Sequence, residues 1–305
     1  MSQLLVVGTV ATDDIETPYG KESNVLGGSA TYFAAGASYF TPVRIVGVVG
    51  EDFQIERLAF LKRRGVDLAG IEVIPGGKTF HWSGRYHHDL NHRDTLSTDL
   101  NVLETFQPDL PAEWRDTPYL FLGNIDPVLQ RQVLEQMKRP KLVAADTMNF
   151  WISSVRAELA KTLARVDALI VNDEEARQLA GTPNLVKAAH AIRAMGPKTV
   201  VIKKGEHGAL LFHEDKVFFA PAYPLEDVRD PTGAGDTFAG GFYGYIARAG
   251  RTDGATLRNA VLYGSALASF CVEAFGPAAL ETLTMKQVEL RVEAFRDLTR
   301  VEELR

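Results

Sequence analysis

Short apolar runs rich in β-branched residues recur along this 305-residue chain, and segments with helical spacing separate them. The runs are nearly continuous rather than alternating with polar residues, which is typical of strands buried on both faces of a parallel sheet. Because parallel strands need crossover connections, usually helices, the alternation predicts an α/β fold with a doubly wound, mostly parallel sheet. The predicted strands are Leu4–Val7, Val43–Val49, Tyr119–Leu122, Leu142–Ala145, Ala168–Val171 and Thr199–Ile202.

The helices between these strands are predicted from apolar spacing and from start and stop signals. One ends before Gly65, one follows Pro127, and one ends at Gly196-Pro197. Proline suits a first helical turn, and glycine followed by proline ends a helix. The expected helices are Phe53–Arg64, Val128–Met137 and Leu185–Met195, with a charged amphipathic surface helix over Met285–Arg305.

Two segments, residues 10–25 and 71–100, break the alternation of strands and helices. The second contains Thr79–His88, where aromatic and polar residues mix as they do in β-hairpins. We therefore predict one α/β domain over residues 1–305, with a small β-sheet lid inserted from these two segments.

Composition excludes several classes of protein. The chain has 33 Lys and Arg against 39 Asp and Glu, a net charge of −6, which is unlike a nucleic-acid binder. Its single cysteine, Cys271, allows no intrachain disulfide and no cysteine-rich zinc site. The longest uncharged apolar stretch, Ala260–Val272, is shorter than the roughly 20 residues that span a bilayer. We expect a cytoplasmic protein without membrane or nucleic-acid partners.

The most informative segment for function is Asp230–Phe242, where glycines stand just ahead of a small-residue helix. Thr232 is expected to cap this helix, and Gly233 and Gly235 allow a sharp turn. Free N–H groups and the positive end of the helix dipole then form an anion site suited to phosphate. Asp236, in the first turn, can accept the proton of an attacking hydroxyl group. The same glycines are also compatible with a tight turn that binds nothing.

This segment, with Asp230-x-Thr232-Gly233-Ala234-Gly235-Asp236-Thr237-Phe238, resembles the C-terminal signature of the ribokinase-like (PfkB) carbohydrate kinases. Further matches follow in the order of that family, from about residue 4 to residue 276. They are Gly8 with Asp13, Gly27-Gly28 before a helix, Val49–Asp52 followed by Gly65-Val66, Asn172-x-x-Glu175, and Lys203–Gly208. The expected fold is therefore ribokinase-like.

The resemblance implies a phosphotransferase that moves a phosphoryl group from ATP to a hydroxyl group of a small sugar or cyclic polyol. Asp236 would be the catalytic base. Gly233, Ala234 and Gly235 would form the anion hole around the transferring group. A nucleoside kinase on the same fold and a non-catalytic ligand-sensing homologue stay open as alternatives.

Substrate-binding residues are expected at two places. Asp13 would orient the acceptor, since a carboxylate can accept hydrogen bonds from two vicinal hydroxyl groups, and Gly27 and Gly28 would let the backbone approach it. Asp146 and Asn149 follow a predicted strand, and ligands of open α/β sheets bind at strand ends. These last two are equally compatible with a cap for the helix that follows.

The resemblance places ATP and Mg²⁺ along a second group of residues. Asn172 and Glu175 would face one side of a helix start and position Mg²⁺ through water, although a solvated helix cap gives the same pattern. Lys204 and Gly205 would lie along the nucleotide or simply form a hairpin turn. Gly276 would lie near the adenine. The family has Gly-Ala at this place, whereas this sequence has Gly276-Pro277.

Two further assignments rest on the resemblance alone. Thr232 would contact the nucleotide, and Asp230 would help to bind a monovalent cation such as K⁺ beside the anion hole. Asp230 is otherwise a turn residue before a proline. Together with Glu175, Asp230 completes the expected metal-binding residues.

The sequence also departs from the family pattern. Tyr32 stands where the N-terminal signature normally has an asparagine that contacts the sugar. Candidates for the wall of the lid are Trp82, Arg85, Tyr86 and His88, which suit either a sugar or a purine ring. Arg85 is open to two interpretations, a contact with a phosphorylated acceptor or an ordinary surface residue. Exposed lid edges are expected to pair in a homodimer.

Overall fold

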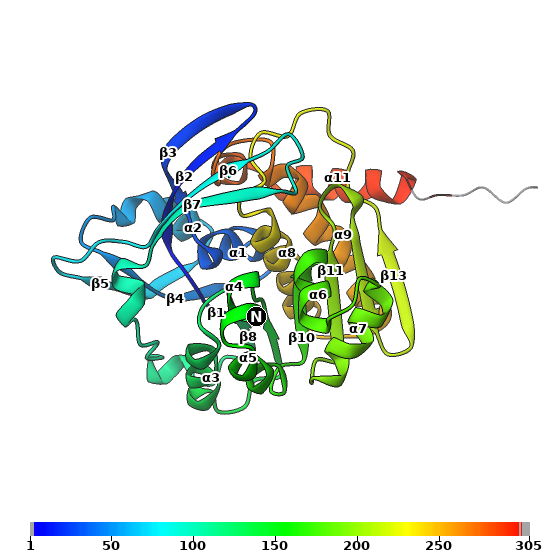
Figure 1. Ribbon diagram of the computed structural model, residues 1–305, viewed down its shortest axis with the longest axis horizontal. Helices are drawn as coiled ribbons and strands as arrows, with labels where there is room; N and C mark the ends of the chain where they lie inside the picture. The colour runs from blue at the N-terminus through cyan, green and yellow to red at the C-terminus, as the bar shows by residue number, and fades with distance from the viewer. Residues whose placement is uncertain (1–2, 299, 301–305) are drawn as a thin grey trace, which may run out of the picture.

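The computed structural model describes residues 3–298 and 300, which form two sheets of unequal size with helices around the larger one (Figure 1). Within this range the large sheet has nine strands. In spatial order they are β13 (Lys216–Ala220), β12 (Ala209–His213), β11 (Thr199–Lys203), β10 (Ala168–Asn172), β9 (Leu142–Ala145), β8 (Tyr119–Leu122), β1 (Leu4–Val7), β4 (Val43–Gly50) and β5 (Asp67–Ile74). Strand β12 pairs antiparallel with both neighbours, and the other pairs are parallel.

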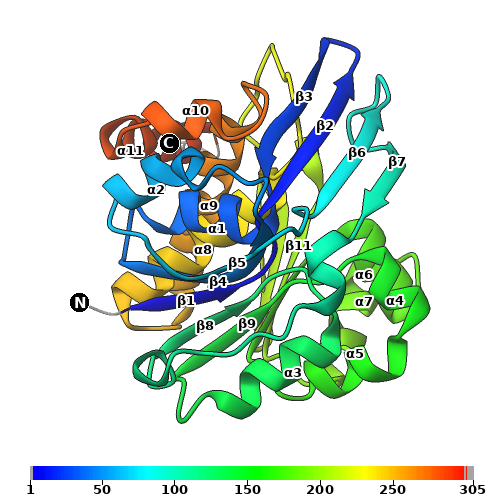
Figure 2. The same ribbon diagram turned by 90° about the vertical axis from the view of Figure 1, so that its left-hand side faces the viewer.

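Helices cover both faces of the large sheet (Figure 2). On one face lie α1 (Ser29–Ala37), α2 (Ala59–Arg63), α8 (Ala234–Ala249), α9 (Gly254–Cys271), α10 (Ala278–Thr282) and α11 (Met285–Leu298). On the other lie α3 (Pro127–Gln136), α4 (Asn149–Ser154), α5 (Arg156–Leu163), α6 (Asp173–Ala180) and α7 (Leu185–Ala194). No helix in the described range is long and apolar enough to cross a membrane.

Strand β1 shows why the apolar runs lack alternation. Leu4 and Val6 pack into the core on the α1 and α8 side, whereas Leu5 and Val7 pack into the core on the α3 side. Successive side chains of a strand point to opposite faces, and both faces are covered here. The doubly wound α/β prediction is therefore confirmed.

The predicted strands agree with the observed ones within one residue at either end. Helices α3 and α7 also lie where they were expected, whereas the expected helix Phe53–Arg64 begins late. Phe53 lies in a turn in which its N–H donates a hydrogen bond to Gly50 O. A short 3₁₀ helix covers Ile55–Leu58, and the α-helical part is α2 alone. No side chain caps α2, so local signals for its start are weak. The expected C-terminal helix is α11, and its remainder lies outside the described residues.

The lid is a separate sheet of four strands with the order β3 (Gly20–Gly27), β2 (Ala11–Thr17), β6 (His81–Tyr86) and β7 (Arg93–Asp99) (Figure 2). The expected lid segment 71–100 is too long at its start. Residues 71–74 belong to β5, which pairs parallel with β4 in the large sheet, because Ile71 packs against the main core. All residues of β7 are exposed. The homodimer through the lid edges stays a prediction.

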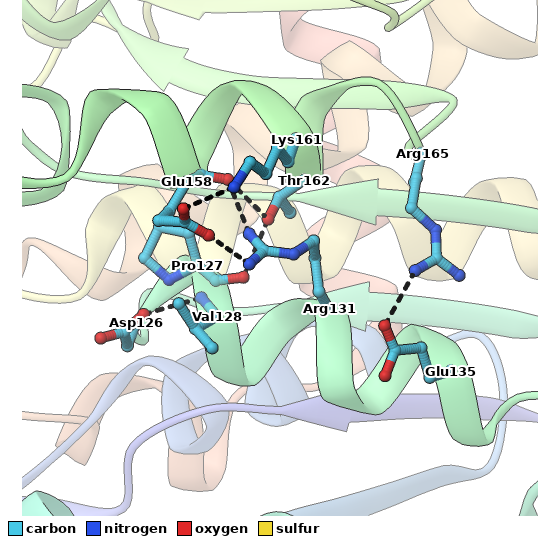
Figure 3. Close-up of polar contacts among 9 residues, drawn as sticks. All are labelled: Asp126, Pro127, Val128, Arg131, Glu135, Glu158, Lys161, Thr162 and Arg165. Atoms are coloured by element: carbon cyan, nitrogen blue, oxygen red, sulfur yellow. Dashed lines mark hydrogen bonds and ion pairs between the residues drawn. The ribbon is translucent and has the colours of Figure 1, made fainter.

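Helices α3 and α5 pack side by side on the face of the sheet opposite α8 (Figure 3). The side chain of Asp126 accepts a hydrogen bond from Val128 N at 2.7 Å and so caps α3. Arg131 forms an ion pair with Glu158, and the hydroxyl of Thr162 donates to Pro127 O at 2.8 Å. These contacts fix α3 through its N-terminal turn.

We predict that Asp126→Ala lowers the free energy of unfolding by about 1 kcal/mol, because the first turn of α3 loses its N-cap. Urea unfolding followed by circular dichroism measures the change. Glu135→Ala on the same helix is the control, since its 3.7 Å contact with Arg165 is a surface ion pair worth little. Equal destabilisation by both variants would contradict the capping role.

Candidate active site

The start of α8 is built by glycine rather than by threonine. Gly233 occupies the N-cap position with a φ of 74°, a left-handed conformation that glycine adopts at no steric cost, and no side chain caps the helix. The expected cap from Thr232 is therefore wrong, because Thr232 lies one residue too early. Its hydroxyl instead donates to the hydroxyl of Tyr86 in the lid at 3.1 Å. The N–H groups of the first turn are left without a capping side chain.

Asp230 ties this turn to the loop after α9. Its carboxylate accepts hydrogen bonds from Thr232 N at 2.8 Å and from Gly276 N at 3.0 Å, and the residue is fully buried. Burial raises the pKa of this carboxyl group. Gly276 thus lies beside the turn that precedes α8, and its expected place near the adenine stays a prediction.

Three carboxylates from different elements gather at the carboxyl ends of β9, β10 and β11. Asp146 follows β9, Glu175 lies in the first turn of α6 after β10, and Asp236 lies in the first turn of α8. Asp146 and Glu175 are 6% and 5% exposed. The charge of Asp146 raises the pKa of both Glu175 and Asp236, so all three lie within electrostatic reach of Asp146.

Asp236 has the electrostatics of a general base. Burial and the nearby charge of Asp146 raise its pKa to about 7, while Lys203 and Arg93 oppose the rise. A base with a pKa near the working pH is ionised often enough to act and basic enough to take a proton. Asp236 therefore suits the role that the sequence analysis gave it.

Asn172 and Glu175 cap α6 together. Asn172 Oδ1 accepts a hydrogen bond from Glu175 N at 2.7 Å, and Glu175 Oε2 accepts one from Asn172 N at 2.8 Å. The capping interpretation is thus confirmed, but the cap is not a solvated one. Burial and Asp146 raise the pKa of Glu175 to about 7. Among the described residues, no group of three or more His, Cys, Asp or Glu side chains is placed to hold a metal ion.

Lys203 is the residue that the sequence analysis missed. It ends β11, and Asp146, Glu175 and Asp236 all raise the pKa of its ammonium group, against the opposing effect of burial. The available signal was a lysine directly after three apolar strand residues, where a charged side chain must lie at the end of the sheet. From the sequence, the contact with the nucleotide was expected at Lys204 instead.

Lys204 and Gly205 begin the turn between β11 and β12, so the hairpin interpretation is confirmed. Lys204 N donates to Gly208 O at 2.7 Å. A Cβ built on Gly205 would overlap the side chain of Asn91, which lies at the tip of the lid between β6 and β7. The lid therefore reaches across to this turn.

Asp13 lies at a bulge of β2 and is 5% exposed. Burial, followed by the charges of Asp230, Asp236 and Asp14, raises its pKa to about 8. A Cβ on Gly27 would overlap the carboxylate of Asp13, so glycine there makes room for this side chain.

Gly28 is the N-cap of α1, with a φ of 100°. A Cβ at this position would overlap Thr9 O, so the close backbone approach also requires glycine. Both positions of the Gly27-Gly28 pair therefore require glycine for steric reasons, Gly27 because of the Asp13 side chain and Gly28 because of the backbone at Thr9.

Tyr32 brings an aromatic ring to the glycine turn before α8. A Cβ on Gly233 would overlap this ring, and the Tyr32 hydroxyl is buried without a hydrogen-bond partner in the described part of the chain. Burial raises its pKa well above the ordinary value, and Asp230 and Asp13 add to the rise. A phenol thus occupies the position of the family's asparagine.

Asp146 and Asn149 do not cap the helix that follows them. Helix α4 begins at Asn149, its N-cap is Met148, and no side chain caps it. Asp146 Oδ1 accepts a hydrogen bond from Thr147 N at 2.8 Å. The capping interpretation is therefore wrong, and both side chains remain at the strand end for another role.

The lid residues separate into two groups. Tyr86 is buried and accepts a hydrogen bond from the hydroxyl of Thr232. Trp82 Nε1 donates a hydrogen bond to the hydroxyl of Thr95 within the lid at 3.3 Å. Arg85 forms a 2.8 Å ion pair with Glu16 and is half-exposed, so the surface interpretation fits it. His88 is exposed.

Asp13 should destabilise the fold as pH rises. Its pKa is raised in the folded state, so stability is full below the unfolded pKa and falls as pH increases toward about 8. We expect Asp13→Asn to raise the free energy of unfolding, and with it the melting temperature. The gain in free energy should widen from about pH 5 to about pH 8 at up to about 1.4 kcal/mol per pH unit. Thermal denaturation measures it, with Asp215→Asn in an exposed turn as control. A margin independent of pH would contradict the burial effect.

Comparison with known proteins agrees with this arrangement. A cytidine kinase from Thermococcus kodakarensis is 30% identical over 254 residues, which cover 81% of this chain and 90% of that protein. Among solved structures, Arabidopsis thaliana ribokinase complexed with ribose and ATP has a TM-score of 0.77 at 23% identity, covering 96% of this chain and 99% of that one. A nucleoside kinase from Burkholderia thailandensis in complex with inosine also gives 0.77, at 21% identity, covering 95% and 98%.

The family model for pfkB family carbohydrate kinases matches residues 1–283. The expected resemblance, the ribokinase-like fold and a phosphotransferase with an alcohol acceptor are thereby confirmed. Because this match covers most of its length, the chain belongs to the pfkB family of carbohydrate kinases.

Proposed function

We propose that this protein transfers the γ-phosphoryl group of ATP to a hydroxyl group of a nucleoside. The observation that carries the phosphoryl transfer is Asp236, a carboxylate with a pKa of about 7 at the uncapped N-terminal turn of α8. Sugar or nucleoside phosphorylation is the activity of the family to which the chain belongs.

Two observations favour a nucleoside acceptor over a free sugar or polyol. The relatives include a cytidine kinase and a nucleoside kinase from Methanothermobacter thermautotrophicus that is 27% identical over 286 residues. Phe150, directly after Asn149 in the first turn of α4, the helix that follows β9, is 56% exposed and contacts Trp151 edge-on. An exposed aromatic ring at a strand end that receives ligands can stack on a nucleobase.

The reaction divides among residues of this chain. Asp13 orients the acceptor, and Asp236 takes the proton of its hydroxyl group as the oxygen attacks the γ-phosphorus. The N–H groups of Gly233, Ala234 and Gly235 bind the oxygens of the transferring group. The bond from phosphorus to the β-phosphate oxygen breaks, and ADP leaves. The lid, which contacts Thr232 and Gly205, excludes water from the reacting groups.

Mg²⁺ fits this arrangement as a water-mediated ion. Asn172 and Glu175 supply the oxygen donors that Mg²⁺ prefers, and their mutual capping leaves no preformed cage. When bound, Mg²⁺ neutralises phosphate charge. A structure of a ribokinase II of E. coli similar to this chain contains ATP and Mg²⁺. Lys204, Gly205, Thr232 and Gly276 are proposed to line the nucleotide.

A monovalent cation such as K⁺ is proposed beside Asp230. This carboxylate is fully buried and accepts hydrogen bonds from two backbone N–H groups, which carry no full charge, so a cation would balance its charge.

The test is ATP consumption with Mg²⁺ across cytidine, uridine, adenosine, inosine, ribose and myo-inositol, with Asp236→Asn as the matched variant. We expect the highest kcat/KM with a nucleoside, and a loss of roughly 10²–10⁴-fold in kcat for the variant with ATP affinity nearly unchanged. A preference for myo-inositol or ribose would replace the nucleoside by a polyol or sugar. Equal loss of ATP binding would remove Asp236 from the role of base.

The pH dependence follows from the raised pKa of Asp236. The base acts only when ionised, so activity falls as protons bind. We expect kcat/KM to rise with pH through about 7 and then level off. Initial rates from about pH 5 to about pH 9 measure the profile. A profile that is flat down to about pH 5 would show that no group with this pKa must be ionised.

A further inference from the structure

Lys203 brings its ammonium group to the start of α8. A Cβ built on Gly235 would lie 2.7 Å from Lys203 Nζ, so the ammonium group occupies the space directly beside the glycine turn. The residue ends β11, next to β10, which leads into Glu175 and α6. The sheet, and not a mobile loop, therefore positions this cation.

The surroundings of Lys203 are mostly anionic. Asp146 after β9, Glu175 on α6 and Asp236 on α8 raise its pKa, and Arg93 on β7 of the lid is the other cation that acts on it. Yet Lys203 Nζ forms no hydrogen bond and no ion pair with any residue that the structure describes. An ammonium group has three donors, and donors held near carboxylates but bonded to none remain free for a ligand.

We propose that Lys203 is a catalytic residue that binds the transferring phosphoryl group, an inference that rests on the proposed function. Its ammonium group donates to a non-bridging oxygen of the γ-phosphoryl group held at Gly233–Gly235. Lys203 stays protonated throughout. The proton of the acceptor goes to Asp236, the new bond joins phosphorus to the acceptor oxygen, and ADP carries away the electrons of the broken bond.

The charge balance explains why a cation is needed there. Asp146, Glu175 and Asp236 would repel an incoming triphosphate, and the partial charge of the α8 N-terminus alone is about half an elementary charge. Lys203 adds a full positive charge directly beside the glycine turn. Phosphoryl transfer depends chiefly on positioning and on such charge neutralisation.

The competing explanation is structural, with Lys203 only balancing the charges of Asp146 and Glu175. Removal of the cation would then lower the stability of the fold and weaken the binding of all nucleotides to the same extent. A contact with the γ-phosphoryl group instead separates ATP from ADP, because ADP lacks that group.

The experiment compares Lys203→Met and Lys203→Arg with Lys216→Met, an exposed lysine at the start of β13 in the same sheet. We expect Lys203→Met to lower kcat roughly 10²–10³-fold with the KM of the acceptor within a few-fold. Its affinity for a non-hydrolysable ATP analogue should fall at least about tenfold while its affinity for ADP changes little. Lys203→Arg should recover part of both losses, and Lys216→Met should behave as wild type.

Each outcome decides the assignment. The assignment would be overturned if Lys203→Met kept a kcat within about threefold of wild type, or if its affinities for ADP and for the ATP analogue fell equally. Circular dichroism and melting temperature report whether Lys203→Met folds; if it does not, Lys203→Arg and Lys203→Gln carry the same comparison. An inactive wild type would defeat the proposed function, whereas the binding of analogue against ADP would still test Lys203.

Discussion

Buried like charges held at one edge of the sheet are the constraint on which the rest of this structure depends. Asp146 raises the pKa of both Glu175 and Asp236, and Lys203 is the cation at the end of β11 that offsets these charges. Such a cluster lowers stability at neutral pH, because ionised groups lose their hydration. It persists because each carboxylate adjoins an element anchored in the core, as α8 is through Phe238 and Phe242.

The same edge also holds the lid. Every residue of the edge strand β7 is exposed, whereas alternate residues of β2 in the same sheet are buried. The attachment of the lid to the large sheet uses the hydrogen bond between Tyr86 and Thr232 and the packing of Asn91 against Gly205. One of these contacts lies at the anion hole and the other at the turn after β11. Closure of the lid is therefore linked to the two places where phosphates are proposed to bind.

Local signals predicted much of the fold. The apolar runs located six strands of the large sheet within a residue, since a strand covered on both faces must be apolar throughout. Proline and glycine marked α3 and α7 well. Prediction was poorer where no local signal exists. The start of α2 has no side-chain cap. The last four residues of β5 were predicted to belong to the lid, and Thr232 forms a hydrogen bond with the lid instead of capping α8.

The sequence by itself determined the α/β alternation, the glycine turn before Asp236 and the kinase family, because these depend on residues that are neighbours along the chain. Only the tertiary structure decided which charges meet. Lys203 joins Asp146 and Glu175 because adjacent parallel strands end at one edge, and Tyr32 faces Gly233 because α1 packs against α8. Spacing in the sequence carries no information about such meetings, since burial and electrostatic coupling arise only when the chain has folded.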